Sequence, residues 1–232
     1  MNRRAQPELG RREQSKLDRR ERIRVAASDL FTRFGYAAAT MRQIAQRAHV
    51  GLGTLFNYAE DKRDLVFLIY NQELDALTDA ALALPRPSEP LVDQLLAVFG
   101  CHYHELGAKP ALARILLQEL TFYSHGKQAA QFLKIRQRLI DGIVELVRRA
   151  QREGRILSAE DPQFIAQQLF FVYSAAIRWW IAAPRPDPDE GVADLRRMLV
   201  LQVNGLLPAS PAERSAKRRQ NGVRRLRQSA PA

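Results

Sequence analysis

The sequence predicts an all-α protein of about nine helices, and three observations support this fold class. Along most of the 232 residues, apolar side chains recur at steps of three and four, which is the spacing of one helix face. The sequence has no sustained alternation of polar and apolar residues, the pattern that predicts strands. Clusters rich in Gly and Pro separate the periodic segments and predict where the helices end.

The N-terminal third contains four predicted helices. The first covers residues 15–34 and ends at Gly35, because glycine readily takes the left-handed conformation that follows a helix. Two short helices follow within residues 40–58, and a longer one covers residues 61–84. The apolar face of the first helix comprises Leu17, Ile23, Ala27, Leu30, Phe31 and Phe34, and that of the long helix comprises Leu65, Leu68, Ile69 and Leu77.

The segment PRPSEP at residues 85–90 marks the join to a body of five predicted helices. The run FIAQQLFFVYSAAIRWWIAA has the length of a membrane span, but it carries Gln167, Gln168 and Arg178. A central helix of a helical bundle is therefore favoured over a membrane helix. The five helices are expected over residues 91–106, 111–123, 128–153, 162–183 and 190–207.

The formal net charge of +11 is concentrated at the two ends of the chain. Residues 1–64 carry 14 Lys and Arg against 8 Asp and Glu, and residues 208–232 carry 7 against 1. Basic ends on a nearly neutral body suggest a polyanion such as nucleic acid as the partner, although solvated charge and a disordered tail would give the same pattern. The single cysteine, Cys101, excludes an intramolecular disulfide, and a cytoplasmic location is expected.

The stretch TMRQIAQRAHVGLGTLF at residues 40–56 predicts two short helices folded against each other. Thr40 and Gln43 have the spacing of a capping box that starts a helix. His49 lies where the chain reverses and is expected in the left-handed region, and Gly51 is an acceptable cap for the second helix. Helices this short are marginal alone, so a helix-turn-helix that presents its second helix to a DNA major groove explains the pattern. The residues expected to face the core are Ile44, Ala45, Leu55 and Phe56.

The longer stretch ATMRQIAQRAHVGLGTLFNYAEDKRDL, preceded by LFTRFGY, resembles the DNA-binding signature of the TetR (tetracycline-repressor) family of bacterial transcription regulators. Together with the helical pattern and the charge distribution, the resemblance implies four segments. These are a basic flexible arm (1–14), a helix-turn-helix DNA-binding domain (15–62), a linking helix with a helical effector-binding and dimerisation domain (63–207), and a basic disordered tail (208–232).

By position, the resemblance also implies a set of DNA-contacting residues. Helix N-termini and Lys side chains attract phosphate, and Asn pairs with an adenine edge, which supports these roles. For Arg42 and Gln43, plain solvation is an equal alternative. The implied residues are Thr40, Met41, Arg42, Gln43, Gly51, Leu52, Gly53, Thr54, Phe56, Asn57, Tyr58 and Lys62.

The sequence departs from the usual family pattern at four positions. His49 stands where Gly is usual, Gly51 where Ser is usual, Phe56 where Tyr is usual, and Ala59 where Phe is usual. Phe56 lacks the hydroxyl that would bond a phosphate, so a purely structural role is an alternative there. The lost bulk at Ala59 suggests that Tyr58 or a residue of the body fills the space.

In the body, the resemblance implies a cavity between the middle helices, suited to a flat hydrophobic or aromatic effector. The last two helices have apolar residues on more than one face, so they are expected to pair with a second copy of the chain. The expected cavity residues are Phe99, Tyr103, His104, Phe122, Tyr123, Tyr173 and Arg178. The expected dimer residues are Phe170, Tyr173, Ala176, Ile177, Trp180, Leu195, Leu199 and Gln202.

The favoured function is a homodimeric repressor that binds a palindromic DNA operator and is released by a small-molecule effector. No cofactor, metal or membrane partner is expected. A non-specific nucleic-acid-binding protein driven by its basic tails is the first alternative. The second is an enzyme using Cys101 and His104, which lie three apart on one helix face, but no orienting third group or phosphate loop accompanies them.

Overall fold

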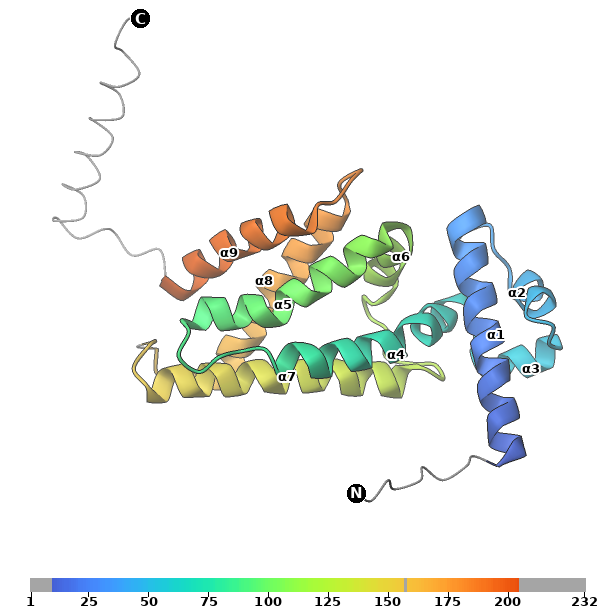
Figure 1. Cartoon of the computed structure of the whole chain (residues 1–232), viewed down its shortest axis with the longest axis horizontal. Helices are drawn as coiled ribbons and strands as arrows, with labels where there is room; N and C mark the ends of the chain where they lie inside the picture. The colour runs from blue at the N-terminus through green and yellow to red at the C-terminus, as the bar shows by residue number, and fades with distance from the viewer. Residues whose placement is uncertain (1–9, 157, 205–232) are drawn as a thin grey trace, which may run out of the picture.

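The structure is a computed structural model that describes residues 10–156 and 158–204 (Figure 1). In these ranges every regular element is a helix, which confirms the all-α prediction. The prediction of a disordered tail over residues 208–232, like that for the first nine residues of the arm, lies outside the described residues. The helices are α1 (Arg11–Phe34), α2 (Met41–Arg47), α3 (Leu52–Phe56), α4 (Lys62–Leu82), α5 (Leu91–Ala108), α6 (Pro110–Glu119), α7 (Ala129–Arg152), α8 (Pro162–Ile181) and α9 (Pro188–Asn204).

Helices α1 to α3 form a small module at one end of the molecule, with α2 and α3 on the side of α1 that faces away from the body (Figure 1). Its core contains Ile23, Phe31, Ile44 and Leu55, all almost completely buried. Helix α1 ends as predicted at Gly35, which has φ 83° and donates its N–H to the Phe31 carbonyl.

Two details of the predicted first helix are wrong. Residues 11–14 were expected in a flexible arm, but α1 already begins at Arg11. Leu17 and Phe34 were expected on the apolar face, but both are exposed. They lie toward the two ends of α1, so periodicity alone overestimates the buried face.

The long helix α4 connects the module to the body and packs against α1, α5, α6 and α7. Leu65, Leu68 and Ile69 are buried as predicted, whereas Leu77 is half-buried. In the body, α5 packs on α9 and α7 packs on α8, and α4 runs alongside α7 (Figure 1). No helix within the described ranges is both long and apolar enough to cross a membrane.

Helix α6 is shorter than predicted. It ends at Glu119 rather than near Tyr123, and residues 120–128 form the connection to α7. In this connection Phe122 has φ 61° and is 91% exposed. A bulky residue rarely takes a positive φ, so the chain must be held in this conformation by its neighbours.

Candidate nucleic-acid interface and effector cavity

The start of α2 is fixed by the predicted capping box. The Thr40 hydroxyl accepts the Gln43 backbone N–H at 3.2 Å, and the Gln43 side chain accepts the Thr40 backbone N–H at 2.9 Å. These bonds satisfy donors that a helix N-terminus otherwise leaves free. The capping box prediction is confirmed, and it fixes the direction in which α2 begins.

The turn between α2 and α3 has the geometry that the sequence predicts. His49 has φ 53°, in the left-handed region, and Val50 donates its N–H to the Ala45 carbonyl at 3.0 Å. Gly51 has extended backbone angles and caps α3. Ala45 and Leu55 are buried, so the five-residue α3 is held by its partner rather than by its own hydrogen bonds.

The predicted DNA-contacting residues lie at three places on the module: the start of α2, α3 with the residues that follow it, and the start of α4. Seven of the twelve residues are exposed, including Arg42, Gln43 and Asn57, and the other five are half-buried. Phe56 was expected in the core, but it is 42% exposed. The core position is taken by Leu55 alone, because consecutive residues on a helix point about 100° apart. This correction leaves Phe56 on the outer surface of α3.

Glycine at position 53 is not required by packing inside the protein. A Cβ at Gly53 would meet no atom within 4 Å, and one at Gly51 would meet only the Thr54 hydroxyl at 3.8 Å. Glycine inside a helix destabilises it relative to alanine. Two exposed glycines in and beside a helix this short therefore suggest that something outside the chain approaches the backbone closely.

Three of the predicted contact groups already have partners within the chain. Lys62 donates to the Tyr36 and Ala37 carbonyls at 2.8 and 3.0 Å, so it ties the start of α4 to the connection between α1 and α2. The Tyr58 hydroxyl donates to the Lys16 carbonyl at 3.2 Å. Thr40 uses its hydroxyl in the capping box. These residues shape the surface, and any contact with DNA is an additional role that stays a prediction.

The module is locked to the body by a buried carboxylate that the sequence did not reveal. Asp64, in the first turn of α4, accepts the Tyr123 hydroxyl and the backbone N–H groups of Glu60, Lys127 and Gln128, the last three at 2.8–3.0 Å. Asp64 is buried, and its partners compensate the cost of burying a charge. We call this set of contacts, Asp64 with residues 123–128, the Asp64 lock.

The Asp64 lock extends to α3 on one side and to the body on the other. The Gln128 side chain, just before α7, donates to the Tyr58 carbonyl at 2.9 Å, two residues after the end of α3. Gln128 also accepts from Asn71 of α4 through its carbonyl at 3.0 Å. Arg63 donates to the Glu119 carbonyl at the end of α6. The connection between α6 and α7 is therefore bonded directly to the DNA-binding module.

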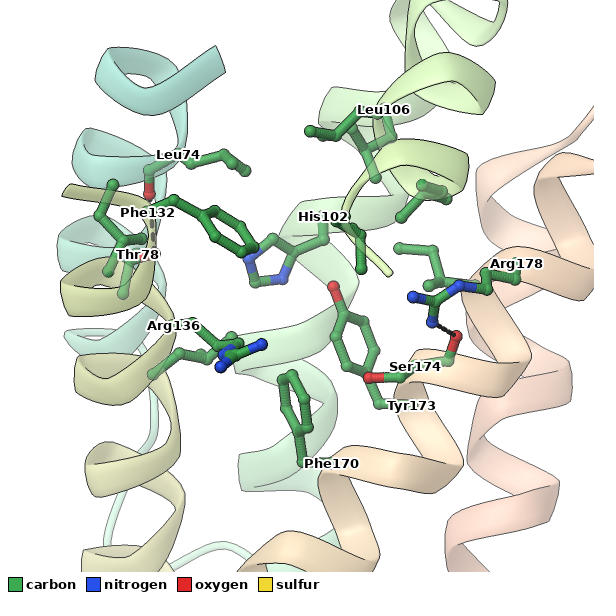
Figure 2. Close-up of a pocket in the computed structure, with 16 residues that line it drawn as sticks. Leu74, Thr78, His102, Leu106, Phe132, Arg136, Phe170, Tyr173, Ser174 and Arg178 are labelled. Carbon is green, nitrogen blue, oxygen red and sulfur yellow. Dashed lines mark hydrogen bonds between the residues drawn. The ribbon is translucent and has the colours of Figure 1, made fainter. Parts of the chain in front are cut away.

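The body contains a mostly apolar cavity between α4, α5, α6, α7 and α8 (Figure 2). Its volume of about 90 Å³ is below the ~150 Å³ of an engineered cavity that holds one benzene molecule. The 16 lining residues are Leu74, Thr78, His102, Leu106, Leu116, Leu117, Leu120, Phe132, Ile135, Arg136, Leu139, Phe170, Tyr173, Ser174, Ile177 and Arg178.

Polar side chains line the cavity from four helices, including Thr78 of α4. Arg136 of α7 and Arg178 of α8 extend toward it from opposite walls, and His102 of α5 lies between them (Figure 2). Arg178 donates to the Ser174 carbonyl at 2.7 Å. None of the lining residues is acidic, so the cavity has two cations and no anion in its wall.

The cavity only partly matches the predicted one. Tyr173 and Arg178 line it. Phe99 is buried behind Tyr173, with the ring centroids 4.2 Å apart, and Tyr123 belongs to the Asp64 lock. Tyr103 packs against Trp180, His104 lies near Asp189 on the surface, and Phe122 points into solvent. These five residues are therefore placed outside this cavity.

Sequence reasoning missed His102, Thr78, Phe132 and Arg136. One signal was available: Phe132, Arg136 and Leu139 follow each other at helical spacing, so Arg136 interrupts an apolar face of α7. A cation on such a face indicates a ligand or an internal partner. His102 faces the cavity because of how five helices pack together, and no local sequence pattern predicts that packing.

The predicted dimer face also needs correction. Tyr173, Ala176, Ile177, Trp180, Leu195 and Leu199 are buried within the chain itself, and Phe170 lines the cavity. Of the eight predicted residues only Gln202 is exposed. Helices α8 and α9 use one apolar face to pack on the body, and sequence periodicity cannot tell that face from one left for a partner.

A second apolar face of α8 and α9 is exposed. Phe164, Phe171 and Trp179 follow each other at steps of seven and eight, so they share one side of α8, and Trp179 is 81% exposed. Met198 and Leu201 of α9 are exposed as well. We call these five residues the α8–α9 apolar face.

Cys101 and His104 do not form a reactive pair. The Cys101 thiol donates to the Ala97 carbonyl, and burial raises its pKa, which disfavours the nucleophilic thiolate. The exposed His104 ring lies 3.8 Å from an Asp189 carboxylate oxygen. Within the described residues, no group of three or more His, Cys, Asp or Glu side chains is placed to hold a metal ion.

Comparisons with known proteins agree with this geometry. The family model "Bacterial regulatory proteins, tetR family" matches residues 23–69. The HTH-type transcriptional regulator YhgD of Bacillus subtilis is 28% identical over 80% of this chain and 96% of its own length. The HTH-type transcriptional repressor KstR of Mycobacterium tuberculosis is 29% identical over 76% of each chain.

Solved structures share the fold. FadR of Thermus thermophilus, a TetR-family repressor solved in complex with lauroyl-CoA, has a TM-score of 0.61 at 24% identity and covers 83% of this chain and 97% of its own. FadR of Bacillus subtilis in complex with stearoyl-CoA has a TM-score of 0.63 at 19% identity, over 81% and 99% of the two chains.

The braced pair α2–α3 on an all-helical body defines a DNA-binding transcriptional regulator of the helix-turn-helix class. The family model matches over this pair, and the relatives aligned along most of the chain are HTH-type transcriptional regulators. The chain belongs to the TetR family of bacterial regulatory proteins.

Proposed function

We propose that this protein is a homodimeric repressor that binds a near-palindromic operator through α2, α3 and the start of α4, and that a small molecule in the body cavity releases it. The observation that carries the proposal is the Asp64 lock. It bonds the connection between α6 and α7, two helices that line the cavity, to the module that carries α3. Such a regulator works in the cytoplasm, where its DNA is.

A dimer is supported by the α8–α9 apolar face. Exposed Trp179 of α8 and exposed Met198 of α9 line the same surface hollow, and exposed Phe171 lies on the same side of α8 as Trp179. Large exposed aromatic residues of this kind mark interaction surfaces. A two-fold axis through this face would bring together two α8–α9 pairs. It would also present two α3 helices to two half-sites, as symmetric helix-turn-helix proteins require.

An effector with an apolar part and a negatively charged part is supported by the cavity wall. Its leucines and Phe132 favour an aliphatic chain or ring, and Arg136 and Arg178 add positive charge with no acidic residue among the lining. Because lauroyl-CoA and stearoyl-CoA are bound in two structural neighbours, acyl-CoA molecules are the first effectors to test.

Release of DNA follows from the size of the cavity. A volume of about 90 Å³ does not hold an acyl chain, so an effector must displace some of the helices that line the cavity, among them α7. Phe132 of α7 lines the cavity and packs against Phe67 of α4, with ring centroids 4.7 Å apart. Displacing α7 would also move Gln128 and, through it, the Tyr58 carbonyl beside α3. The effector thus favours a state with a different spacing of the two α3 helices.

The test is selection of DNA by the full-length protein from a random duplex pool, followed by addition of lauroyl-CoA to the selected complex. The proposal expects a near-palindrome with two half-sites about one helical turn apart and a loss of DNA affinity of at least about tenfold. Selection of a single half-site by a monomer would contradict the dimer. An unchanged DNA affinity with every acyl-CoA tested would contradict the effector class.

A reporter gene behind the selected operator decides the direction of regulation. Deleting the regulator should raise expression of the reporter, because a repressor blocks the promoter it binds. KstR is named a repressor, whereas FasR of Mycolicibacterium smegmatis, 25% identical over 80% of this chain, is named an activator. A fall in expression on deletion would identify an activator.

A further inference from the structure

Two polar side chains, His102 of α5 and Tyr173 of α8, reach the interior of the cavity. His102 is 4% exposed, and its Nδ1 atom has no hydrogen-bond partner among the described residues. Figure 2 shows the His102 ring inside the cavity, with the Tyr173 hydroxyl pointing toward it from α8. The two rings have centroids 5.5 Å apart.

The other polar side chains of the cavity differ from this pair because they are occupied or lie at its edge. Thr78 donates its hydroxyl to the Leu74 carbonyl at 2.7 Å, and Arg178 donates to the Ser174 carbonyl. These are the two hydrogen bonds drawn among the lining residues in Figure 2. A buried polar group without a partner costs free energy, so its retention in an otherwise apolar wall needs a reason.

We propose that His102 and Tyr173 together bind an uncharged oxygen atom, such as a thioester carbonyl, within the apolar part of the effector. The inference rests on the proposed function, because it assigns the ligand chemistry of the same cavity. It adds that effectors with this oxygen are selected over effectors of equal length that lack it.

The oxygen must be uncharged because of where it lies. Burial lowers the pKa of His102 to about 4, so the imidazole is neutral at physiological pH and offers one donor and one acceptor. Burial also raises the pKa of Tyr173, which keeps its hydroxyl as a donor. A carboxylate beside two neutral groups would be a buried charge without a counter-ion. The negative part of the effector belongs instead near Arg136 and Arg178.

The test compares lauroyl-CoA with S-dodecyl-CoA, the thioether that lacks only the carbonyl oxygen. Their dissociation constants are measured by calorimetry on the full-length protein. We expect lauroyl-CoA to bind about tenfold more tightly, since one or two net hydrogen bonds are worth roughly that ratio. Tyr173→Phe removes only the hydroxyl, and His102→Phe removes the imidazole. In each variant the ratio of the two dissociation constants should fall toward one, because lauroyl-CoA binds more weakly while binding of the thioether stays nearly unchanged.

Thr78→Val is the matched control, because it removes a hydroxyl from the same cavity that already has a partner, and it should keep the wild-type ratio. Thermal melting of each variant verifies folding, and Tyr173→Phe alone suffices if His102→Phe does not fold. Equal binding of the two ligands to the wild type would overturn this inference and leave the proposed effector class intact. So would a ratio that stays at the wild-type value in Tyr173→Phe. Binding of neither ligand would overturn the effector class as well.

Discussion

The Tyr123 hydroxyl, in the connection between α6 and α7, donates a hydrogen bond to the buried carboxylate of Asp64 in the first turn of α4. The Tyr123 ring also stacks on Phe67 of α4, with centroids 3.6 Å apart, and Phe67 in turn contacts Phe132 at the cavity wall. A continuous set of contacts therefore runs from the cavity to the start of the helix that carries the DNA-binding module.

Tyr123→Phe should weaken the response to effector more than it weakens DNA binding. The change removes a hydrogen bond to a charged group, which is worth about 1.5–3 kcal/mol of unfolding free energy, but it keeps the ring stack. Operator affinity should stay within about threefold, while the loss of affinity on adding effector shrinks. Fluorescence anisotropy with labelled operator measures both. Tyr70→Phe is the control, since the buried Tyr70 hydroxyl has no hydrogen-bond partner in the described part of the chain and its removal should change neither property.

Gly126→Ala should break the Asp64 lock. Gly126 has φ 121°, and an added Cβ would lie 2.6 Å from an Asp64 carboxylate oxygen, so the connection must move. We expect a loss of several kcal/mol of unfolding free energy, measured by urea denaturation. A variant as stable as the wild type would show that the close packing around Asp64 is absent.

Gly53→Ala should separate DNA binding from stability. The added methyl group meets no atom of the protein and favours the helix, so the free energy of unfolding should stay equal or rise by up to about 1 kcal/mol. Operator affinity should fall at least about tenfold, because the methyl group lies where we expect the DNA backbone. Unchanged affinity would remove Gly53 from the DNA-binding surface.

Lys62→Ala and Thr40→Ala should weaken DNA binding and leave the dimer intact. A Lys that holds a phosphate contributes to the salt dependence of binding. Lys62→Ala should therefore reduce the steepness of log affinity against log salt concentration by about one unit per subunit. If Lys62 acts only through the Tyr36 and Ala37 carbonyls, affinity falls with the slope unchanged. As the control for dimerisation, light scattering measures the molar mass of each variant in solution, which should remain that of a dimer.

Trp179→Glu should produce a monomer that no longer binds its operator tightly. The change places a charge in the centre of the α8–α9 apolar face, where a partner would have to desolvate it. Light scattering measures the mass, and circular dichroism verifies that the helices remain. Leu84→Glu, at an exposed apolar residue outside this face, should stay dimeric. A dimeric Trp179→Glu protein would contradict the proposed interface.

His102 makes stability depend on pH in a defined window. Its pKa is about 4 in the folded protein and about 6.5 when unfolded, so the unfolded chain binds the proton first. The stability contributed by neutral His102 is complete above pH 6.5 and is lost as the pH falls toward 4, by up to about 3 kcal/mol. Urea denaturation from pH 7 to pH 4 should show a smaller loss for His102→Phe. Parallel curves for the two proteins would contradict the buried, neutral imidazole.

Local chemistry made the helix-turn-helix predictable from the sequence. The Thr40–Gln43 box, the left-handed His49 and the stop at Gly35 each depend on residues within a few positions of one another. Such features follow from propensity and short-range hydrogen bonds. Phe56 was misplaced because a five-residue helix is too short for periodicity to define a face.

The cavity, the Asp64 lock and the dimer face depend on contacts between distant segments. Asp64 and Gln128 are 64 residues apart, and no pattern in either segment indicates the other. Ile177 and Trp179 are both apolar residues of α8, yet one is buried in the chain and the other is exposed. Periodicity identifies apolar faces, but only the packed structure shows which face the chain covers itself.

The most direct test of the central claim is binding of the full-length protein to DNA flanking its own gene and to shuffled DNA of equal length, across a salt series. A specific regulator should prefer the flanking DNA by ~10³-fold or more at physiological salt. Equal affinity for the two DNAs with a steep salt slope would contradict the claim, because binding would then be non-specific neutralisation of phosphate by the basic ends of the chain.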